Sequence, residues 1–290
     1  MQKIVPHLWF DKEAKEATAF YATLFPNSKV KSVQTITGTP SGDCDIVSFN
    51  LNGYDFMAIS AGPYFKFNPS ISLTATCATV EEAKALYDKL SAGGKDLMPF
   101  QEYPWSKGYA WVSDKYGLSW QINTEQEGGK IIPSLMFTGD NFGKVEEALA
   151  FYTSVFKNAE TKMISRYEKG EGDVEGKVKY SLSMLESQPF MIMESSFEHG
   201  FTFNEAVSLI VKCEDQAEID YYWDKLSAVP EAEQCGWLKD KFGVSWQITP
   251  TAMDAMLSSG DKEAANRVTQ AFLKMKKFNI AELERAYENK

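Results

Sequence analysis

The chain has 290 residues, a formal net charge of −10 and 44% hydrophobic residues, as expected of a globular protein with room for two domains. The acidic balance leaves no basic stripe that could neutralise phosphates, so we predict no nucleic-acid partner. No apolar run is long enough to span a membrane, and the first residues lack a signal-peptide pattern. We therefore predict no membrane partner and a cytoplasmic location.

Two long segments of the chain are nearly the same. Residues 4–25 (IVPHLWFDKEAKEATAFYATLF) correspond to residues 131–156 (IIPSLMFTGDNFGKVEEALAFYTSVF). Residues 111–122 (WVSDKYGLSWQI) correspond in the same way to residues 237–248 (WLKDKFGVSWQI). A repeat of this length predicts one structural unit that is present twice, so any pocket should occur in related pairs.

The first half contains, in order, a strand, a helix, a hairpin, a strand, a second helix and a final hairpin. The first helix is predicted from apolar residues at one-face spacing, and Pro26 ends it. The first hairpin is predicted from Asn52-Gly53, because both residues tolerate the positive φ of a tight turn. The predicted strands cover residues 6–10, 46–51, 54–60 and 70–77, and the last hairpin ends at residue 122.

The second half repeats this order after a glycine-containing linker, and an unrepeated tail follows Pro250. In the tail, Asp261 and Asn279 are predicted to cap two helices. The predicted fold class is α+β, with two tandem βαβββ-repeat domains over residues 1–125 and 131–250 and a helical C-terminal tail over residues 251–290. We expect the tail to cover an open sheet edge or a dimer face.

The two halves carry recurring motifs, an AFYxxxF helix and a DxxGxSWQ ending. With FNEAVSLIVKCEDQAEIDYYWDKLS (203–227), these motifs resemble the vicinal oxygen chelate superfamily of glyoxalase I, bleomycin-resistance proteins and extradiol dioxygenases. Within it, the chain is most similar to the PhnB-like branch, often labelled 3-demethylubiquinone-9 3-methyltransferase domain. The residues do not support the methyltransferase label, because no Gly-rich turn joins a strand to a helix to hold a nucleoside cofactor.

The resemblance implies that paired modules form cups, which usually hold a divalent metal. It places ligands on the first, middle, next and last strands, and the first and last often come from different modules. The implied sites are His7, Ser60, Ser208 and Gln247 in one cup, and Ser134, Glu194, Ser72 and Gln121 in the other. Each set holds one strong ligand, so we assign no metal-ligating residue, and a divalent metal is the one cofactor that stays open.

His7 and Glu194 are the candidate catalytic residues. His7 shares a strand face with Trp9, so it is either a buried, hydrogen-bonded residue or a ligand-binding residue or general base at the cup floor. Glu194 closes an apolar strand, so its carboxylate either emerges into solvent or points into the cup. The candidate ligand-binding residues are Trp9, Phe67, Phe203, Ser72, Ser134, Ser208, Gln121 and Gln247.

The favoured hypothesis is a binding protein with an aromatic-lined cup that holds a small molecule, as in the bleomycin-resistance relatives. The alternative is a metal-dependent lyase, isomerase or dioxygenase that uses His7 and Glu194. A third hypothesis is metal-free acid–base catalysis by the same two residues, so enzymatic activity remains open. The expected partner is a small-molecule ligand, and the chain is expected to be a monomer or a homodimer.

Overall fold

A computed structural model of the chain describes residues 2–290, which form two mixed β-sheets with helices packed against them. Sheet A has the strand order β14-β15-β13-β1-β4-β3-β2. Its strands are β1 (Ile4–Phe10), β2 (Lys29–Thr39), β3 (Gly42–Leu51), β4 (Tyr54–Ser60), β13 (Val207–Cys213), β14 (Trp237–Lys239) and β15 (Ser245–Pro250).

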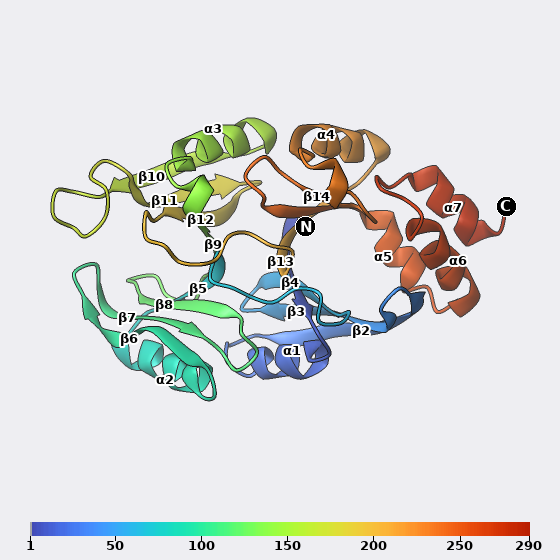
Figure 1. Cartoon of the computed structure of the whole chain (residues 1–290). Coiled ribbons are helices and arrows are strands. Elements are labelled where there is room, and N and C mark those ends of the chain that lie inside the picture. Colours follow the sequence, from blue (N-terminus) through green and yellow to red (C-terminus); the bar gives the residue numbers. More distant parts are fainter. Residues whose placement is uncertain (1) are drawn as a thin grey trace.

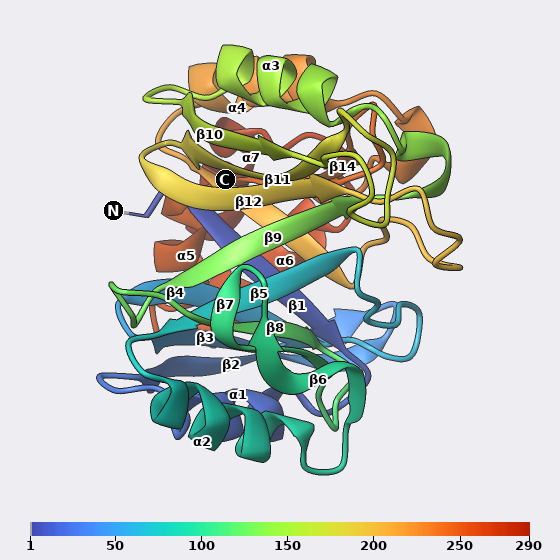
Figure 2. The ribbon, with the colours of Figure 1, turned by 90° about the vertical axis from the view of Figure 1, so that its left-hand side faces the viewer.

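Sheet B has the corresponding order β10-β11-β12-β9-β5-β8-β7-β6. Its strands are β5 (Ile71–Cys77), β6 (Lys95–Tyr103), β7 (Ser106–Ser113), β8 (Ser119–Thr124), β9 (Ile131–Phe137), β10 (Glu160–Arg166), β11 (Val178–Leu185) and β12 (Gln188–Glu194). Figure 2 shows sheet B face-on, with β9 and β5 crossing its middle.

Each sheet combines strands from both halves of the chain. In sheet A, β1 pairs antiparallel with β13, and in sheet B, β5 pairs antiparallel with β9. The first βαβββ module therefore shares a sheet with the fourth module, and the second shares a sheet with the third. This exchange brings residues far apart in the sequence onto one sheet face.

The four module helices pack on one face of the sheets and enclose the core. They are α1 (Ala14–Ala22), α2 (Val80–Ser91), α3 (Val145–Val155) and α4 (Gln216–Leu226). In β1, Ile4, Leu8 and Phe10 belong to the buried apolar cluster, so the alternate residues of the strand face the other way. We call that other face cup A in sheet A and cup B in sheet B.

The DxxGxSWQ motif has a structural cause. Asp240 is fully buried and accepts hydrogen bonds from Tyr152 Oη (2.8 Å), Trp246 Nε1 (2.9 Å) and two backbone amides. Asp114 accepts from Tyr21 Oη (2.7 Å) and Trp120 Nε1 (3.0 Å) in the same way. Each aspartate thus ties the tyrosine of the AFYxxxF helix to the tryptophan of the last strand, which explains why the motifs occur together.

The C-terminal tail forms α5 (Thr251–Leu257), α6 (Lys262–Phe272) and α7 (Ile280–Glu288). Beside β14, the backbone amides of Cys235 and Gly236 donate to the carbonyls of Met275 and Lys276, each at 2.8 Å. At the other edge of the sheet, α6 contacts β2. In Figure 1 the three helices lie together on the right, near β14 and the end of β2. The tail thus packs at both edges of sheet A, through the residues just before β14 and through α6 on β2, as expected.

The second half departs from the first before its last hairpin. The segment between α4 and β14 contains a short 3-10 turn at Pro230–Ala232, whereas the first half has the nine-residue strand β6 at the same point. Sheet B accordingly ends in the long hairpin β6–β7, which lies in front of β5 and β8 in Figure 2. The two cups therefore have different rims.

Candidate functional site

His7 lies at the floor of cup A. Its side chain is 5% exposed, and its Nδ1 atom has no hydrogen-bond partner among residues 2–290. The ring of Trp237 lies edge-on to the imidazole, with 5.6 Å between ring centroids. Burial lowers the pKa of His7 to about 3, because the charged form loses its hydration. The imidazole is therefore neutral at pH 7 and can accept or donate one hydrogen bond at Nδ1.

Aromatic side chains form a wall beside this histidine. Trp9 is partly exposed and lies 5.0 Å from Phe65, 6.0 Å from Trp237 and 6.4 Å from Tyr64, measured between ring centroids. Its indole nitrogen donates to Gly62 O at 2.8 Å, which fixes the orientation of the ring. The predicted placement of Trp9 on the His7 face is thus confirmed, and the wall keeps some of its surface accessible.

The polar floor of cup A comes from the second half of the chain. Ser208 lies directly opposite His7 across the β1–β13 pair and accepts a hydrogen bond from Gln247 Nε2 at 2.9 Å. Ser245 lies on the same face of β15 as Gln247, and its buried hydroxyl has no partner among the described residues. The sheet therefore brings His7, Ser208 and Gln247 together, as the resemblance implied, and leaves two buried polar atoms unpaired.

Ser60 and Glu194 do not lie in the cups. Glu194 lies on the same face of β12 as Phe190 and Ile192, which belong to the core under the helices. Its carboxylate accepts hydrogen bonds from Gly143 N (2.6 Å) and Val178 N (2.8 Å). Ser60 Oγ accepts from Ala14 N at the start of α1 (3.1 Å). The prediction that Glu194 points into solvent or into a cup is wrong, because the carboxylate binds backbone amides that open α3 and β11.

Phe67 and Phe203 also lie outside the cups. Phe67 packs edge-on against Phe10 at 5.0 Å, and Phe203 packs edge-on against Phe137 at 5.1 Å. Both partners belong to the buried apolar cluster on the helix-covered face. The ligand-binding assignment of these two phenylalanines is therefore wrong, because they close the ends of the core.

Cup B has a floor of hydroxyl groups that satisfy one another. Ser134 and Thr74 share a hydrogen bond of 2.7 Å, and Ser72 and Ser119 share one of 2.9 Å. Gln121 accepts from Tyr109 Oη at 2.9 Å. The sheet brings Ser134, Ser72 and Gln121 onto one face, as the resemblance implied. Sequence reasoning missed Thr74 and Ser119, although both alternate in phase with the residues it named.

The upper wall of cup B is rich in methionine. Met191 pairs with Ser134 and with Leu182 across its neighbouring strands, so it shares their face. Met136, Met191 and Met193 are all partly exposed, unlike the fully buried residues that alternate with them. Methionine is flexible and fills irregular space, so this wall is apolar and adaptable. The alternation in PFMIME (189–194) was the available signal for it.

Neither cup holds a donor set that fits a divalent metal. Cup A offers one imidazole, His7, with the neutral hydroxyl of Ser208 and the neutral amide of Gln247. Among the described residues, no three His, Cys, Asp or Glu side chains gather in a way that could hold a metal ion. Hard divalent metals favour carboxylate and imidazole ligands, so we derive no chemistry from a metal here.

A serine–histidine pair lies outside the cups. His199 Nε2 is 2.9 Å from Ser195 Oγ, and that hydroxyl donates to Asp173 Oδ2 at 3.1 Å. Because the serine proton points to the aspartate, His199 must donate to the serine and cannot act as its base. The cluster therefore joins two loops and does not activate a nucleophile.

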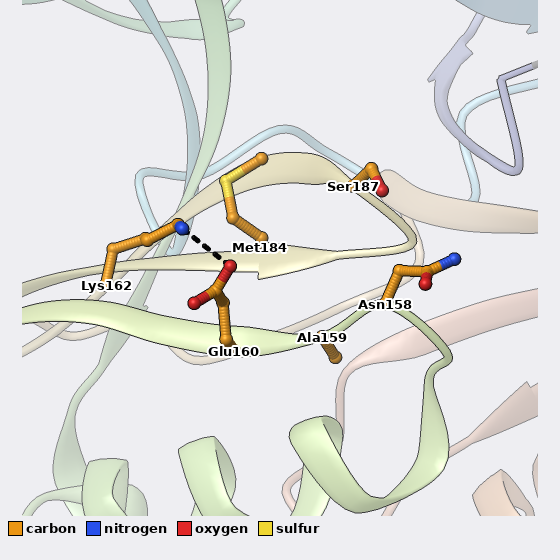
Figure 3. Close-up of a pocket in the computed structure, with 6 residues that line it drawn as sticks. All are labelled: Asn158, Ala159, Glu160, Lys162, Met184 and Ser187. Atoms are coloured by element: carbon orange, nitrogen blue, oxygen red, sulfur yellow. Dashed lines mark ion pairs between the residues drawn. The ribbon is translucent and has the colours of Figure 1, made fainter.

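A shallow depression of about 350 Å³ lies at the edge of sheet B, where β10 begins beside the β11–β12 turn. Figure 3 shows the side chains around it, with Glu160 and Lys162 paired to each other at 2.6 Å. Neither His7 nor Ser134 contributes to its lining. The depression is thus separate from both cups and has no unpaired charge to attract a ligand.

The profile of one protein family, described as 3-demethylubiquinone-9 3-methyltransferase, matches residues 2–123 and again residues 129–249. The chain belongs to this family. The two matches in tandem confirm the resemblance to the PhnB-like branch of the vicinal oxygen chelate superfamily. They also confirm the α+β fold class with tandem modules and a helical tail.

Relatives from this family correspond to one half of the chain. Protein YjdN of Escherichia coli (strain K12) is 32% identical over 139 residues, which are 42% of this chain and 95% of that protein. A solved structure from Bacillus cereus, described as a putative 3-demethylubiquinone-9 3-methyltransferase, PhnB protein, is 38% identical and covers 43% of this chain and 100% of that chain, with a TM-score of 0.40. Each of these two proteins thus aligns over almost its whole length with less than half of this chain.

The fold of almost the whole chain is also found in a solved structure of low sequence identity. The structure of glyoxalase I from Zea mays aligns over 86% of this chain and 94% of that chain, with 12% identity and a TM-score of 0.51. At this identity the likeness concerns the fold alone.

No helix among residues 2–290 is both long and apolar enough to cross a membrane.

Proposed function

We propose that cup A binds a small, flat, largely apolar molecule through contacts with Trp9 and Trp237 and, once the side chains covering His7 shift, through a hydrogen bond to its buried Nδ1 atom. The unpaired, buried Nδ1 atom is the observation that carries this proposal. A buried polar atom without a partner costs about 1–3 kcal/mol, and a ligand that pairs with it recovers that cost. The hydroxyl of Ser245 on the same sheet is likewise buried and unpaired, so the same shift of covering side chains would give the ligand a second hydrogen-bonding group.

The walls favour an aromatic or conjugated ligand. The ring of Trp9 lies 5.0 Å from that of Phe65 and 6.0 Å from that of Trp237, and both pairs meet edge-on. Such rings bind flat molecules by stacking and edge contacts, and a few polar groups then fix the orientation. The ligand should be neutral, because a neutral imidazole in a buried site offers no charge to pair with.

Binding without turnover fits these residues better than catalysis. A general base works best when its pKa lies near the operating pH, and the pKa of His7 at about 3 is far below it. Glu194, the second residue of the enzymatic alternative, is committed to backbone amides on the other face. The methyltransferase description of the family is not proposed for this chain, because its mixed sheets offer no Gly-rich strand-to-helix turn.

A fragment screen monitored by NMR tests this proposal. The indole N–H signals of Trp9 and Trp237 report on cup A, and those of Trp120 and Trp246 report on the core. We expect neutral aromatic fragments to shift the first pair selectively, and His7→Phe to weaken their binding about three- to thirty-fold. His199→Phe is the matched control and should bind as the parent chain does. Fragments that bind without shifting the indole signals of Trp9 and Trp237, or that bind His7→Phe as tightly as the parent chain, would exclude this site.

A further inference from the structure

A second depression, of about 400 Å³, lies between α6 and α7 of the tail. Its lining is cationic, and it contains no aspartate or glutamate among the described residues. The lining residues are Asn266, Arg267, Gln270, Ala271, Lys274, Arg285, Ala286, Asn289 and Lys290. We call this depression the tail groove. Like the depression beside β10, it is shallow and open to solvent.

The composition of the tail groove is unusual for this chain. The whole chain has three arginines, and two of them, Arg267 and Arg285, line the groove. The chain as a whole carries a net charge of −10, so this concentration of positive charge runs against its average. A solvated surface built only for solubility would not need arginines gathered in one depression.

Arg267 makes the groove rigid. Its Nε donates to Ala286 O at 2.9 Å, and its Nη2 donates to Tyr287 O at 2.8 Å. One guanidinium on α6 thus holds the last carbonyls of α7, which fixes the distance between the helices. The backbone of the groove is therefore preformed, and binding would have to order only exposed side chains such as Lys274 and Arg285.

We propose that the tail groove binds a small polyanion whose phosphate groups pair with Arg285 and Lys274. The guanidinium of Arg285 bonds within α7 only through Nε, to Ala281 O at 3.2 Å, so its planar fork can present two further donors. The side-chain amides of Asn266 and Gln270 add neutral donors on the α6 side. Lys290 is paired with Glu288 at 2.5 Å and is left out of the proposed contacts.

A phosphate-bearing ligand fits better than a carboxylate-bearing one. Two cationic side chains from separate segments, Lys274 just after α6 and Arg285 on α7, line one depression, and each phosphate offers several acceptor oxygens to an arginine fork. The net acidity of the chain opposes anions at long range, so the attraction must be local and sensitive to salt. This proposal is independent of cup A, because none of its residues belongs to that cup.

Calorimetric titration of the full chain with sodium pyrophosphate tests the proposal. We expect saturable binding with about one site, weakened about ten-fold or more in Arg285→Gln and in Lys274→Gln. Lys277→Gln is the matched control: Lys277 pairs with Asp220 at 2.8 Å outside the groove, so its loss should leave pyrophosphate binding unchanged. Circular dichroism and thermal unfolding of each variant check that the tail stays folded.

Three outcomes would overturn the proposal. They are no saturable heat with millimolar pyrophosphate at 50 mM NaCl, equal affinity in the parent and Arg285→Gln, and an equal loss in Lys277→Gln. The last outcome would indicate diffuse attraction to positive charge in place of a site. Binding that weakens steadily between 50 and 200 mM NaCl while keeping one site supports it.

Discussion

His7 on β1 lies directly opposite Ser208 on β13, so the floor of cup A is built from the first and fourth modules of the chain. Gln247 on β15, also in the fourth module, donates a hydrogen bond to Ser208. Neither half alone contains this floor. The duplication therefore produces a composite site, in which each half of the chain supplies part of the floor.

The stability of the protein should depend on the protonation of His7. Its pKa is about 6.5 when unfolded and about 3 when folded, so the unfolded chain binds more protons between these values. The part of the free energy of unfolding that depends on a neutral His7 is fully present above pH 6.5 and is lost as the pH falls toward 3. We expect the free energy of unfolding of the parent chain to fall relative to His7→Phe by up to about 3 kcal/mol between pH 6.5 and 4. Urea unfolding of both proteins measures the difference, and a constant difference across this range would show that His7 is not buried as described.

Asp240 should be essential to the fold. Burial raises the pKa of Asp240 to about 6, so the side chain is mostly ionised at pH 7. The carboxylate accepts hydrogen bonds from four donors. Asp240→Asn places an amide donor against the indole N–H of Trp246 or the hydroxyl of Tyr152. We expect a loss of about 2–4 kcal/mol in urea unfolding. Asp140→Asn, at an exposed position in the same half, is the control and should lose less than about 0.5 kcal/mol.

Glu194 should matter for stability and not for ligand binding. Glu194→Ala leaves the amides of Gly143 and Val178 without their acceptor, so we expect a loss of about 2–4 kcal/mol. Ser60→Ala removes one neutral acceptor at the equivalent place, and we expect about 1 kcal/mol. Fragment binding to cup A should be unchanged in both variants when they are measured well below their unfolding temperatures. A selective loss of fragment binding in Glu194→Ala would contradict the position described for its carboxylate.

Gly236 should control the attachment of the tail. Its φ is +82°, and an added Cβ would lie 2.5 Å from the ring of Phe278, which is itself buried. Gly236→Ala should therefore push Phe278 out and expose the segment after Pro250 to proteases. Limited trypsin digestion followed by mass spectrometry measures this. Gly260→Ala has a similar φ of +85° but open space around the added Cβ, so it should strain the turn without releasing the tail.

Sequence reasoning predicted which residues would share a strand face more reliably than it predicted which face they would occupy. Glu194 alternates in phase with Phe190 and Ile192, but the alternation alone does not show whether that set meets helices or the cup. Phe67 and Phe203 lie before strands β5 and β13, in segments without a period, so no pattern fixes the direction of their side chains. His7, Ser208, Ser72 and Ser134 share cup faces as the resemblance implied, because β1 pairs with β13 and β5 pairs with β9.

The position of the tail was only partly predictable. Its helix caps were readable, since Asp261 and Asn279 accept from the backbone amides of Ala264 and Glu282 as a capping pattern predicts. Its span from β14 to β2 depends on contacts with both edges of sheet A, and no local pattern encodes those. The tail groove likewise could not be predicted, because Arg267 and Arg285 are not neighbours in the sequence and line one depression only when α6 packs against α7.

The most direct test is ¹⁵N NMR of the histidine side chains, because the chain has two histidines and His199→Phe assigns them. We expect the His7 ring to stay neutral from pH 8 down to about pH 4, and its Nδ1 signal to move when a cup A fragment binds. A His7 ring that titrates near pH 6.5, or an Nδ1 signal that no bound fragment changes, would contradict the proposed site.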